Sequence, residues 1–334
     1  MFFFRLVCVC QVRKIPGIVT PQSGERDKYR EMKNNVWIIV LNWNGPDDTV
    51  ECVESCLKID YEPYQILIVD NHSTNNSVEI FRRKFSNIPL IVNEENFGYA
   101  GGNNIGIKYA LNHGADYVFL LNNDVVVEPP VLSKLVEGMC AFPLATMAAP
   151  KVLYYDARHV INSMGTSIDW FRLRPYLGEC QQVDHGQYVS IVKKDILVGC
   201  ALMVRCNVLQ EIGLIDEKFF ILQEEADWCL RNLRHRHENI VVPEAVVYHK
   251  GSKTIRNFSE VTHYYSVRNF LYLCHKNAGW IDRSKSWCGL FLLCIKNMLR
   301  LLMGNRRERT MARIFFDASY DYFRGAMGKC LRSY

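Results

Sequence analysis

Short apolar runs alternate with polar, helix-like segments in the first third of the chain. Residues 36–41 are continuously apolar, as expected of a strand buried on both faces. A helix that opens near Asp47 follows, then a second apolar run at 66–69 and a second helix ending near Phe85. Residues 89–92 predict a third strand. Because strands and helices alternate, the pattern predicts an α/β fold with right-handed crossovers and a mostly parallel sheet.

Two predicted strands end in an aspartate. The run 117–121 leads into Asn122, Asn123 and Asp124, and the run 66–69 leads into Asp70. Ligands of α/β sheets bind at the carboxyl ends of the strands. A carboxylate at that edge suits Mg²⁺ or Mn²⁺, which commonly carry the phosphates of a substrate. The two aspartates therefore predict a metal-assisted nucleotide site.

The later part of the chain is less regular. Strands are predicted at 199–204 and 241–249 and a helix within 219–235, whereas 150–198 are predicted to be irregular. Residues 287–295 are uncharged, but Lys296 and Arg300 follow, so this run is predicted to be too short to span a membrane. Its leucines, interleaved with basic residues, predict a helix lying in the membrane interface or, alternatively, packed on the catalytic domain.

The charge distribution separates the end of the chain from its body. The 334 residues are 49% hydrophobic and carry a net charge of +5. Residues 276–334 hold twelve Lys or Arg against four acids, a net +8, which leaves −3 for the rest. A basic tail favours an anionic surface, either membrane or nucleic acid. Aromatic platforms for nucleic acid are not arranged here, so we expect membrane contact through 285–334 and no nucleic acid.

The cysteine count and the N-terminal sequence indicate the cellular compartment and the domain boundaries. The thirteen cysteines are odd in number and lack a zinc-like spacing, which favours a reducing cytosol. Residues 1–10 make a poor signal peptide because the apolar stretch is short and holds Arg5. Met32 directly precedes the first strand, so a chain that starts there is expected to fold. We predict a leader at 1–34 that lies outside the fold, a catalytic domain at 35–255 and a basic helical tail at 256–334.

The glycines of residues 93–104 resemble a nucleotide loop only superficially. Their sequence is NEENFGYAGGNN, whose GxxGG spacing differs from the GxGxxG of dinucleotide-binding folds. The glycines are expected to let the backbone of a loop approach a ligand, with Asn103 or Asn104 capping the next helix.

Six ordered segments carry a specific resemblance. Through them the chain resembles the family 2 inverting glycosyltransferases, in particular the branch of bacterial rhamnosyltransferases, and the resemblance covers roughly residues 35–275. The resemblance implies a GT-A fold, a Rossmann-like α/β architecture. The segments are DNHSTNNS, ENFGYAGGNN, LLNND, GCALMVR, DEKFFILQEEADWCLR and VPEAVVYHKGS.

The resemblance also implies the donor site. Asn42 and Asn44 are expected near the nucleotide base, with Asp70 accepting from a pyrimidine N3–H. A helix cap shared with Ser73 is the alternative role for Asp70. The full set of donor-binding residues is Asn42, Asn44, Asp70, Asn96, Gly98, Gly101, Asn103 and Asn123.

Metal binding is assigned by resemblance to Asp124 and His249. Asn122 stands where an Asp-x-Asp motif has its first acid, so only Asp124 is expected to hold Mg²⁺ or Mn²⁺ directly. The ion would bridge the two phosphates and offset charge on the departing nucleoside diphosphate.

The acidic start of the helix within 219–235 is expected to supply the general base. Glu225 takes the position that the family assigns to this role, with Glu224 and Asp227 as alternates. Asp227 and Arg231 have the i, i+4 spacing of a helix salt bridge, which is the structural alternative.

These expectations define an inverting transferase. Its donor is a nucleoside-diphosphate sugar, with dTDP-rhamnose favoured, and its acceptor is a hydroxyl of a glycan or lipid-linked glycan in cell-surface polysaccharide synthesis. The expected location is cytoplasmic, peripheral on the inner face of the cell membrane. A sugar nucleotidyltransferase would need a basic Gly-rich loop after the first strand, and residues 42–45 hold no Lys or Arg. A non-catalytic binding member is disfavoured because Asp124 and Glu225 are both present.

Overall fold

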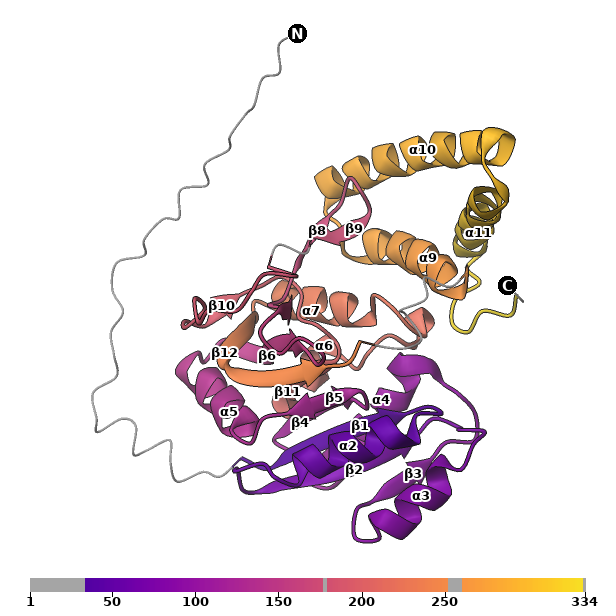
Figure 1. Ribbon diagram of the computed structural model, residues 1–334. Coiled ribbons are helices and arrows are strands. Elements are labelled where there is room, and N and C mark those ends of the chain that lie inside the picture. The colour runs from indigo at the N-terminus through magenta and orange to yellow at the C-terminus, as the bar shows by residue number, and fades with distance from the viewer. Residues whose placement is uncertain (1–33, 177–178, 252–259, 333–334) are drawn as a thin grey trace, which may run out of the picture. The chain divides into compact units, whose positions relative to one another are not determined.

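The computed structural model describes residues 34–176, 179–251 and 260–332 (Figure 1). The predicted leader therefore lies outside the described residues, except for Asn34, at which one compact unit begins. The strands are β1 (Val36–Asn42), β2 (Tyr64–Asp70), β3 (Leu90–Val92), β4 (Tyr117–Asn122), β5 (Val125–Val127), β6 (Ala145–Tyr154), β7 (Ile161–Ser163), β8 (Ser167–Asp169), β9 (Arg174–Tyr176), β10 (Val192–Lys193), β11 (Ala201–Arg205) and β12 (Glu238–His249). The helices are α2 (Pro46–Cys56), α3 (Ser77–Lys84), α4 (Gly98–Asn112), α5 (Val131–Ala141), η1 (Cys206–Val208), α6 (Leu209–Ile212), η2 (Glu217–Phe219), α7 (Glu224–Arg234), α9 (Glu260–Asn277), α10 (Trp280–Met303) and α11 (Arg306–Phe323).

One large sheet crosses the catalytic part of the described chain. Its order is β10-β12-β6-β11-β4-β1-β2-β3, with β5 added beside β12 and β7 beside β6. Strands β3, β2, β1 and β4 are parallel, and β11 enters antiparallel between β4 and β6. The α/β prediction is confirmed, and the parallel prediction holds for the N-terminal half, where each connection is a crossover helix.

Successive side chains of β1 point to opposite faces of the sheet, as the pleat of a strand requires. Ile38 packs in one apolar core together with Cys52 and Cys56 of α2. Ile39 packs in the other core, with Ile107 of α4. Helices therefore cover both faces of this half of the sheet, which explains the uninterrupted apolar run of the strand.

Helix α4 corrects the prediction of a glycine loop. Residues from Gly98 onward are helical, so Asn103 and Asn104 lie inside the helix instead of capping it. The glycines serve close packing: a Cβ on Gly102 would lie 2.6 Å from Leu41, and one on Gly106 would lie 2.5 Å from a methyl group of Ile39. The predicted loop was wrong because these small residues bring a helix against a sheet.

Strand β6 was missed, since residues 150–198 were predicted to be irregular. It lies between β12 and β11, and nine of its ten residues are buried. Pro150 made the segment look like a turn. The proline is tolerated because the partner strand has a register shift between Val242 and Val246, directly beside it.

The last three helices pack on the catalytic part (Figure 1). Among the described residues, α10 alone is long and apolar enough to cross a membrane, judged by length and composition only. The prediction that this segment is too short was wrong, because Lys296 and Arg300 do not interrupt the helix. The helix that follows, α11, begins with a capping box between Asn305 and Glu308.

Candidate functional site

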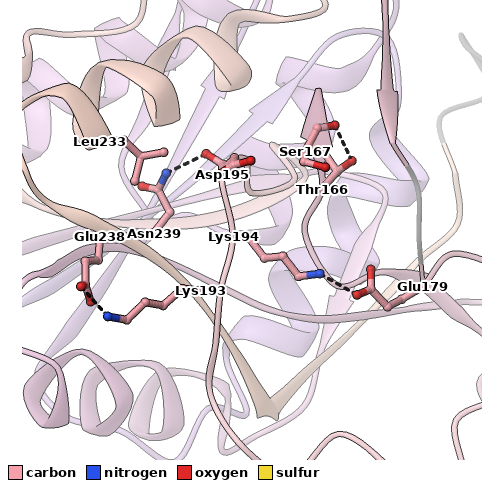
Figure 2. A pocket seen from close by; sticks show the side chains of 9 residues that line it. All are labelled: Thr166, Ser167, Glu179, Lys193, Lys194, Asp195, Leu233, Glu238 and Asn239. Carbon is pink, nitrogen blue, oxygen red and sulfur yellow. Dashed lines mark hydrogen bonds and ion pairs between the residues drawn. The ribbon is translucent and has the colours of Figure 1, made fainter. Parts of the chain in front are cut away.

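A cavity of about 490 Å³ lies beside β10 and β12, away from every predicted site residue. Figure 2 shows that ion pairs fill much of its polar lining: Lys193 bonds to Glu238 at 2.5 Å, and Lys194 to Glu179 at 2.6 Å. Because the lining side chains already pair with one another, the cavity does not present the convergent free polar groups of a ligand site.

The ends of β1 and β2 form the first part of the predicted site. The backbone register pairs Asn42 with Asp70. The Nδ2 of Asn42 donates to Asp70 Oδ2 at 2.7 Å, and the backbone N–H and hydroxyl of Ser73 donate to the two Asp70 oxygens at 2.8 and 2.7 Å. The side chains of Asn42 and Asp70 are fully buried. These bonds stabilise the turn after β2, whereas α3 begins at Ser77 with Asn76 as its N-cap, so the alternative of a helix cap by Asp70 was wrong. Contact of Asp70 with a nucleotide base stays a prediction.

Asn123 connects this network to the metal-site strand. Its Nδ2 donates to Asn42 Oδ1 at 3.3 Å and to Thr49 Oγ1 at 3.0 Å. Asn44 adopts a left-handed conformation (φ 55°) and accepts from the backbone N–H of Thr74 at 2.8 Å. The Asn42 amide is thus a hub that fixes the loops after β1 and β4 relative to each other.

The predicted donor residues of α4 have contacts within the protein. Asn96 Oδ1 accepts from the Gly98 N–H at 2.8 Å, which anchors the helix start. A Cβ on Gly98 would lie 2.3 Å from the Phe220 carbonyl oxygen, and one on Gly101 would lie 2.7 Å from the Phe97 Cβ. These two glycines are thus explained by internal packing, without a bound ligand.

Asn103 is also engaged within the protein. Its Nδ2 donates to the carbonyl of Tyr99, one turn earlier in α4, at 2.9 Å. The side chain is almost fully buried. Its predicted contact with the donor stays a prediction.

Asp124 and His249 are brought together by the pairing of β5 with β12. His249 lies opposite Val125 in that pairing, and its Nε2 is 3.3 Å from Asp124 Oδ1. Both ring nitrogens are buried and lack a hydrogen-bond partner. Unsatisfied buried imidazole nitrogens are costly. A carboxylate beside such a ring fits a divalent cation as the missing partner.

The described residues contain no group of three or more His, Cys, Asp or Glu side chains that could hold a metal ion. A cation at Asp124 and His249 would therefore need further oxygen ligands from outside the protein chain. Mg²⁺ prefers an all-oxygen shell, so the nitrogen ligand favours Mn²⁺ of the two ions expected.

Lys250 was missed by the sequence analysis although it directly follows His249. Its Nζ contacts Asp48 at 2.7 Å and Glu51 at 2.5 Å. These two carboxylates raise the pKa of Lys250, against the effect of burial. Because two carboxylates already pair with it, Lys250 fixes the residue after His249 to α2 and offers no uncompensated positive charge.

Glu224 and Glu225 open α7 and are held in an environment of low polarity. Glu224 is 4% exposed, and its Oε2 has no hydrogen-bond partner. Burial, followed by the charge of Glu225, raises the pKa of Glu224 well above its ordinary value. Burial also raises the pKa of Glu225, and backbone N–H groups at the helix start oppose that shift. Perturbed carboxylates of this kind are typical of acid–base sites.

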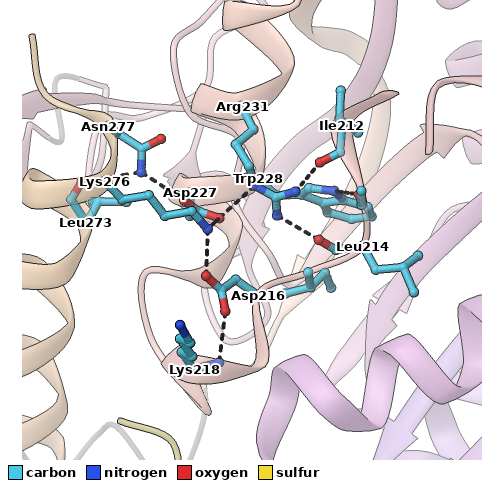
Figure 3. A network of polar contacts seen from close by, with 12 residues as sticks. Ile212, Leu214, Asp216, Lys218, Asp227, Trp228, Arg231, Leu273, Lys276 and Asn277 are labelled. Atoms are coloured by element: carbon cyan, nitrogen blue, oxygen red, sulfur yellow. Dashed lines mark hydrogen bonds and ion pairs between the residues drawn. The ribbon is translucent and has the colours of Figure 1, made fainter. Parts of the chain in front are cut away.

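Asp227 has a structural environment instead. Figure 3 shows it between Arg231 and Lys276, whose nitrogens lie 2.8 and 2.9 Å from Oδ2, while Asn277 donates to Oδ1 at 2.8 Å. The side chain is fully buried. The helix salt bridge is confirmed, and a base needs a free lone pair within reach of its substrate. Geometry therefore favours Glu225 over Asp227.

The segment Gly199–Cys200 joins the metal-site pair to the carboxylates of α7. A Cβ on Gly199 would lie 3.3 Å from the Cβ of Glu225. The carbonyl of Cys200 accepts from the Asn122 N–H at 2.9 Å. Burial first, then the charges of Asp124 and Glu225, raise the pKa of the Cys200 thiol. The charges of Asp124 and Glu225 thus both reach one buried thiol, at the sheet edge where β4 ends and β11 begins.

Tyr99 completes this arrangement and was also missed. Its hydroxyl donates to the Gly199 carbonyl at 2.5 Å. Burial first, then the charges of Glu224 and Glu225, raise its pKa well above the ordinary value. The position of Tyr99 directly after Gly98, at the start of α4, was the only sequence signal for its role.

The fold and this site define a GT-A glycosyltransferase. Residues 37–211 match the model of the family described as Glycosyl transferase family 2, and the chain belongs to that family. This membership decides against the nucleotidyltransferase alternative.

Named relatives lie in the rhamnosyltransferase-like branch. The chain is 25% identical over 256 residues to the dTDP-rhamnosyl transferase RfbF of Shigella flexneri, covering 74% of this chain and 82% of the relative. It is 23% identical over 270 residues to the N-acetylglucosaminyl-diphospho-decaprenol L-rhamnosyltransferase of Mycobacterium tuberculosis, covering 74% and 86%.

Two solved structures share the fold. GalNAc-T7 with UDP, GalNAc and Mn²⁺ aligns with a TM-score of 0.60 at 14% identity, over 87% of this chain and 57% of that chain, so the present chain spans just over half its length. The mannosyltransferase PcManGT from Pyrobaculum calidifontis, with GDP-Man and Mn²⁺, aligns with a TM-score of 0.55 at 14% identity, over 88% of each chain. At such identities the likeness concerns the fold alone.

Proposed function

We propose that this glycosyltransferase moves a sugar, with dTDP-rhamnose as the favoured donor, to a hydroxyl of a glycan or lipid-linked glycan, with inversion at the anomeric carbon. One observation carries the proposal: the charges of Asp124, which lies beside His249, and of Glu225 both act on the buried Cys200 thiol. A diphosphate group and an acceptor hydroxyl need such adjacent sites. The names of the two rhamnosyltransferase relatives support the choice of donor.

Asp124 and His249 would hold Mn²⁺ or Mg²⁺ against the donor diphosphate. Bound there, the ion supplies positive charge that stabilises the departing nucleoside diphosphate. The protein's part is positional: the β5–β12 pairing holds the ring of His249 beside Asp124, and the ion pairs of Lys250 with Asp48 and Glu51 fix the end of β12 to α2. The orphaned ring nitrogens of His249 support this assignment over a purely structural histidine.

Glu225 would accept the proton of the acceptor hydroxyl. The acceptor oxygen then bonds to the anomeric carbon as the bond from that carbon to the diphosphate oxygen breaks. The raised pKa of Glu225 suits a base, because it increases the affinity of the carboxylate for a proton. Burial and the charge of Glu225 raise the pKa of Glu224 well above its ordinary value, so simultaneous ionisation of the two neighbouring carboxylates is disfavoured.

The nucleotide end of the donor would lie over the loops that Asn42 organises. Asp70, Asn44 and Asn123 surround this hub and face the same sheet edge as Asp124. Their amide and carboxylate groups suit a pyrimidine base, whose N–H needs a matched acceptor. Asp70 is fully buried, so its contact with the base would require the hydrogen bonds from Ser73 to Asp70 to break.

We also propose peripheral binding to the inner face of the cell membrane, where a lipid-linked acceptor is presented. The support is the distribution of residues around α10, whose exposed face is more apolar than its buried face. Of the four buried residues of this helix, Ser286, Gly289, Leu290 and Asn297, only Leu290 is large and apolar. The outward residues are large and apolar; Phe291 is 65% exposed and Leu302 70%. A helix that only packed on a soluble protein would show the opposite arrangement.

The inner face of α10 is fastened to the catalytic part, which favours a helix lying flat over one that spans. Ser286 Oγ donates to the Trp170 carbonyl at 3.0 Å. A Cβ on Gly289 would lie 1.9 Å from the Phe171 carbonyl oxygen, so the backbones are in close contact. Spanning a bilayer would break these contacts, whereas lying in the interface keeps them.

Titration against a panel of sugar nucleotides with Mn²⁺, followed by a transfer assay with the tightest binder, tests the function. We expect dTDP-rhamnose to bind most tightly and the product to have the anomeric configuration opposite to the donor's, read by NMR. Binding of none of the panel would contradict the proposed function. Retention of configuration would contradict the role of Glu225.

A further inference from the structure

The turn that leads into α7 has an unusual backbone. Phe220, Leu222 and Gln223 all have positive φ values, of 65°, 71° and 75°. Residues with a Cβ disfavour this left-handed region, because the Cβ approaches the carbonyl oxygen. Glu224 and Glu225 follow directly. The surrounding structure must therefore hold the turn 219–223 in place, and with it the direction in which the two carboxylates point.

The side chain of Asn269, in α9, forms hydrogen bonds with this turn. The amide nitrogen of Asn269 donates to the carbonyls of Phe219, Ile221 and Leu222 at 2.8, 2.8 and 2.9 Å. Asn269 is fully buried. An amide has two N–H donors, so three carbonyls converging on it leave its nitrogen no capacity for any other partner.

Arg268 fixes which way that amide faces. Its Nε donates to Asn269 Oδ1 at 3.1 Å, so the oxygen of the amide is turned away from the carbonyls of the turn. The guanidinium itself donates to the carbonyls of Ala326 at 3.3 Å and Gly328 at 2.7 Å. Gly328 N–H in turn donates to the Lys218 carbonyl at 2.8 Å. The C-terminal segment thereby braces the same turn.

The opposite side of the turn lies against α4. The carbonyl of Phe220 accepts from the Ala100 N–H at 3.3 Å, next to Gly98. Tyr99, between these two residues, is the residue that reaches Gly199 beside Glu225. The turn is therefore gripped between α4 and α9, and Asn269 supplies the larger number of hydrogen bonds.

We propose that Asn269 is a positioning residue, which locks the turn 219–223 so that Glu225 is directed at the Gly199–Cys200 edge of the site. Asn269 does not touch the substrate; it acts through the turn. Its effect on turnover rests on the proposed function, but its effect on the turn does not. Loss of the amide should leave the donor site intact and misdirect the base.

Two substitutions separate this role from simple packing. Asn269→Asp keeps the shape but places an acceptor against three carbonyl oxygens, and Asn269→Ala removes the side chain. The control is Asn297→Ala, because Asn297 is an equally buried asparagine of α10 whose amide donates to Leu293 of its own helix at 2.9 Å. If both variants misfold, Arg268→Lys removes the Nε donor to Asn269 together with the guanidinium contacts to Phe219 and Gly328, and keeps a charge.

Hydrogen exchange of the peptide 219–228 is the first measurement, since it needs no turnover. We expect faster exchange in the Asn269 variants, or in Arg268→Lys, than in wild type or Asn297→Ala. We also expect kcat to fall by about tenfold to a hundredfold, with the dissociation constant of the donor changed by less than about twofold, because small displacements of catalytic groups have costs of this size.

Unchanged exchange in the turn would overturn the proposal, and so would altered exchange with a wild-type kcat. A wild-type protein that transfers no sugar from any donor would instead contradict the proposed function. In that case the exchange measurement still decides whether Asn269 holds the turn.

Discussion

His249 Nε2 lies 3.3 Å from Asp124 Oδ1, and neither nitrogen of the buried imidazole has a hydrogen-bond partner. The pairing of β5 with β12 sets this distance, since it places His249 opposite the residue that follows Asp124. The contact with Asp124 is the single polar contact that this ring makes among the described residues, and Nδ1 has no partner there. This arrangement supports the proposal that the two side chains share a bound cation.

Asp124→Ala is expected to abolish transfer with little change in the fold. Removing the carboxylate removes one of two protein ligands, so Mn²⁺ and nucleoside diphosphate together should no longer raise the melting temperature. In the wild type the same ligands should raise it, because ligands that bind only the folded state stabilise it. Excess chelator should reproduce the loss of activity in the wild type. Full activity of the variant or in chelator would exclude the metal role.

Glu225→Gln is expected to lower kcat by about 10²- to 10⁴-fold, the usual contribution of a general base, and to leave the affinity for donor unchanged. Asp227→Ala is the matched comparison, two residues along the same helix. Its loss removes the buried carboxylate partner of Arg231 and leaves Lys276 paired with Asp216 alone, which should reduce the free energy of unfolding by about 3–5 kcal/mol.

Kinetics and chemical denaturation of the two variants distinguish a base from a structural acid. A wild-type rate for Glu225→Gln would move the base to another carboxylate. An unaltered unfolding free energy for Asp227→Ala would contradict the structural role drawn from its contacts.

The sequence predicted the elements whose signals are local. The apolar run of β1 and the acidic start of α2 are complete signals in themselves, and both elements were found. Strand β6 was missed, and α4 was expected to begin only at Asn103 or Asn104, because Pro150 and Gly98 resemble turn residues in isolation. Each is accommodated by a distant partner, a register shift in β12 and the Phe220 carbonyl respectively.

For the candidate site too, some features were predicted from the sequence and others were not. The resemblance named Asp124, His249 and Glu225, and the structure gathers them at one sheet edge. It did not reveal that Asp227 is engaged by Lys276, about fifty residues further along the chain. The grip of Asn269 on the turn before α7 was equally invisible, because contacts between distant segments leave no periodic signal.

The raised pKa of Glu224 predicts a pH dependence of stability. Burial, and then the charge of Glu225, raise this pKa above its ordinary value of 4.5, so the folded protein binds the proton more tightly than the unfolded chain does. The stabilisation is fully present below pH 4.5 and is lost as the pH rises through the folded-state pKa. Glu224→Gln should remove this loss. Melting temperatures from pH 4.5 to 8 would show a flatter profile for the variant; parallel profiles would contradict the assignment.

The outward face of α10 predicts binding to anionic membranes. Phe291→Glu places a charge on that face without touching the core, so it should abolish co-flotation with vesicles containing anionic lipid and leave the melting temperature unchanged. The matched control is Leu144→Glu, because Leu144 is also exposed, at 58%, but lies on the catalytic part. Wild type should float with anionic vesicles in low salt and less in high salt, as expected for a basic tail. Trp287, stacked at 6.2 Å on Phe323 of α11, should report insertion by a blue shift of its fluorescence.

Equal flotation of Phe291→Glu and wild type would contradict membrane docking through this helix. Extraction that requires detergent, where high salt fails, would instead indicate that α10 spans the bilayer.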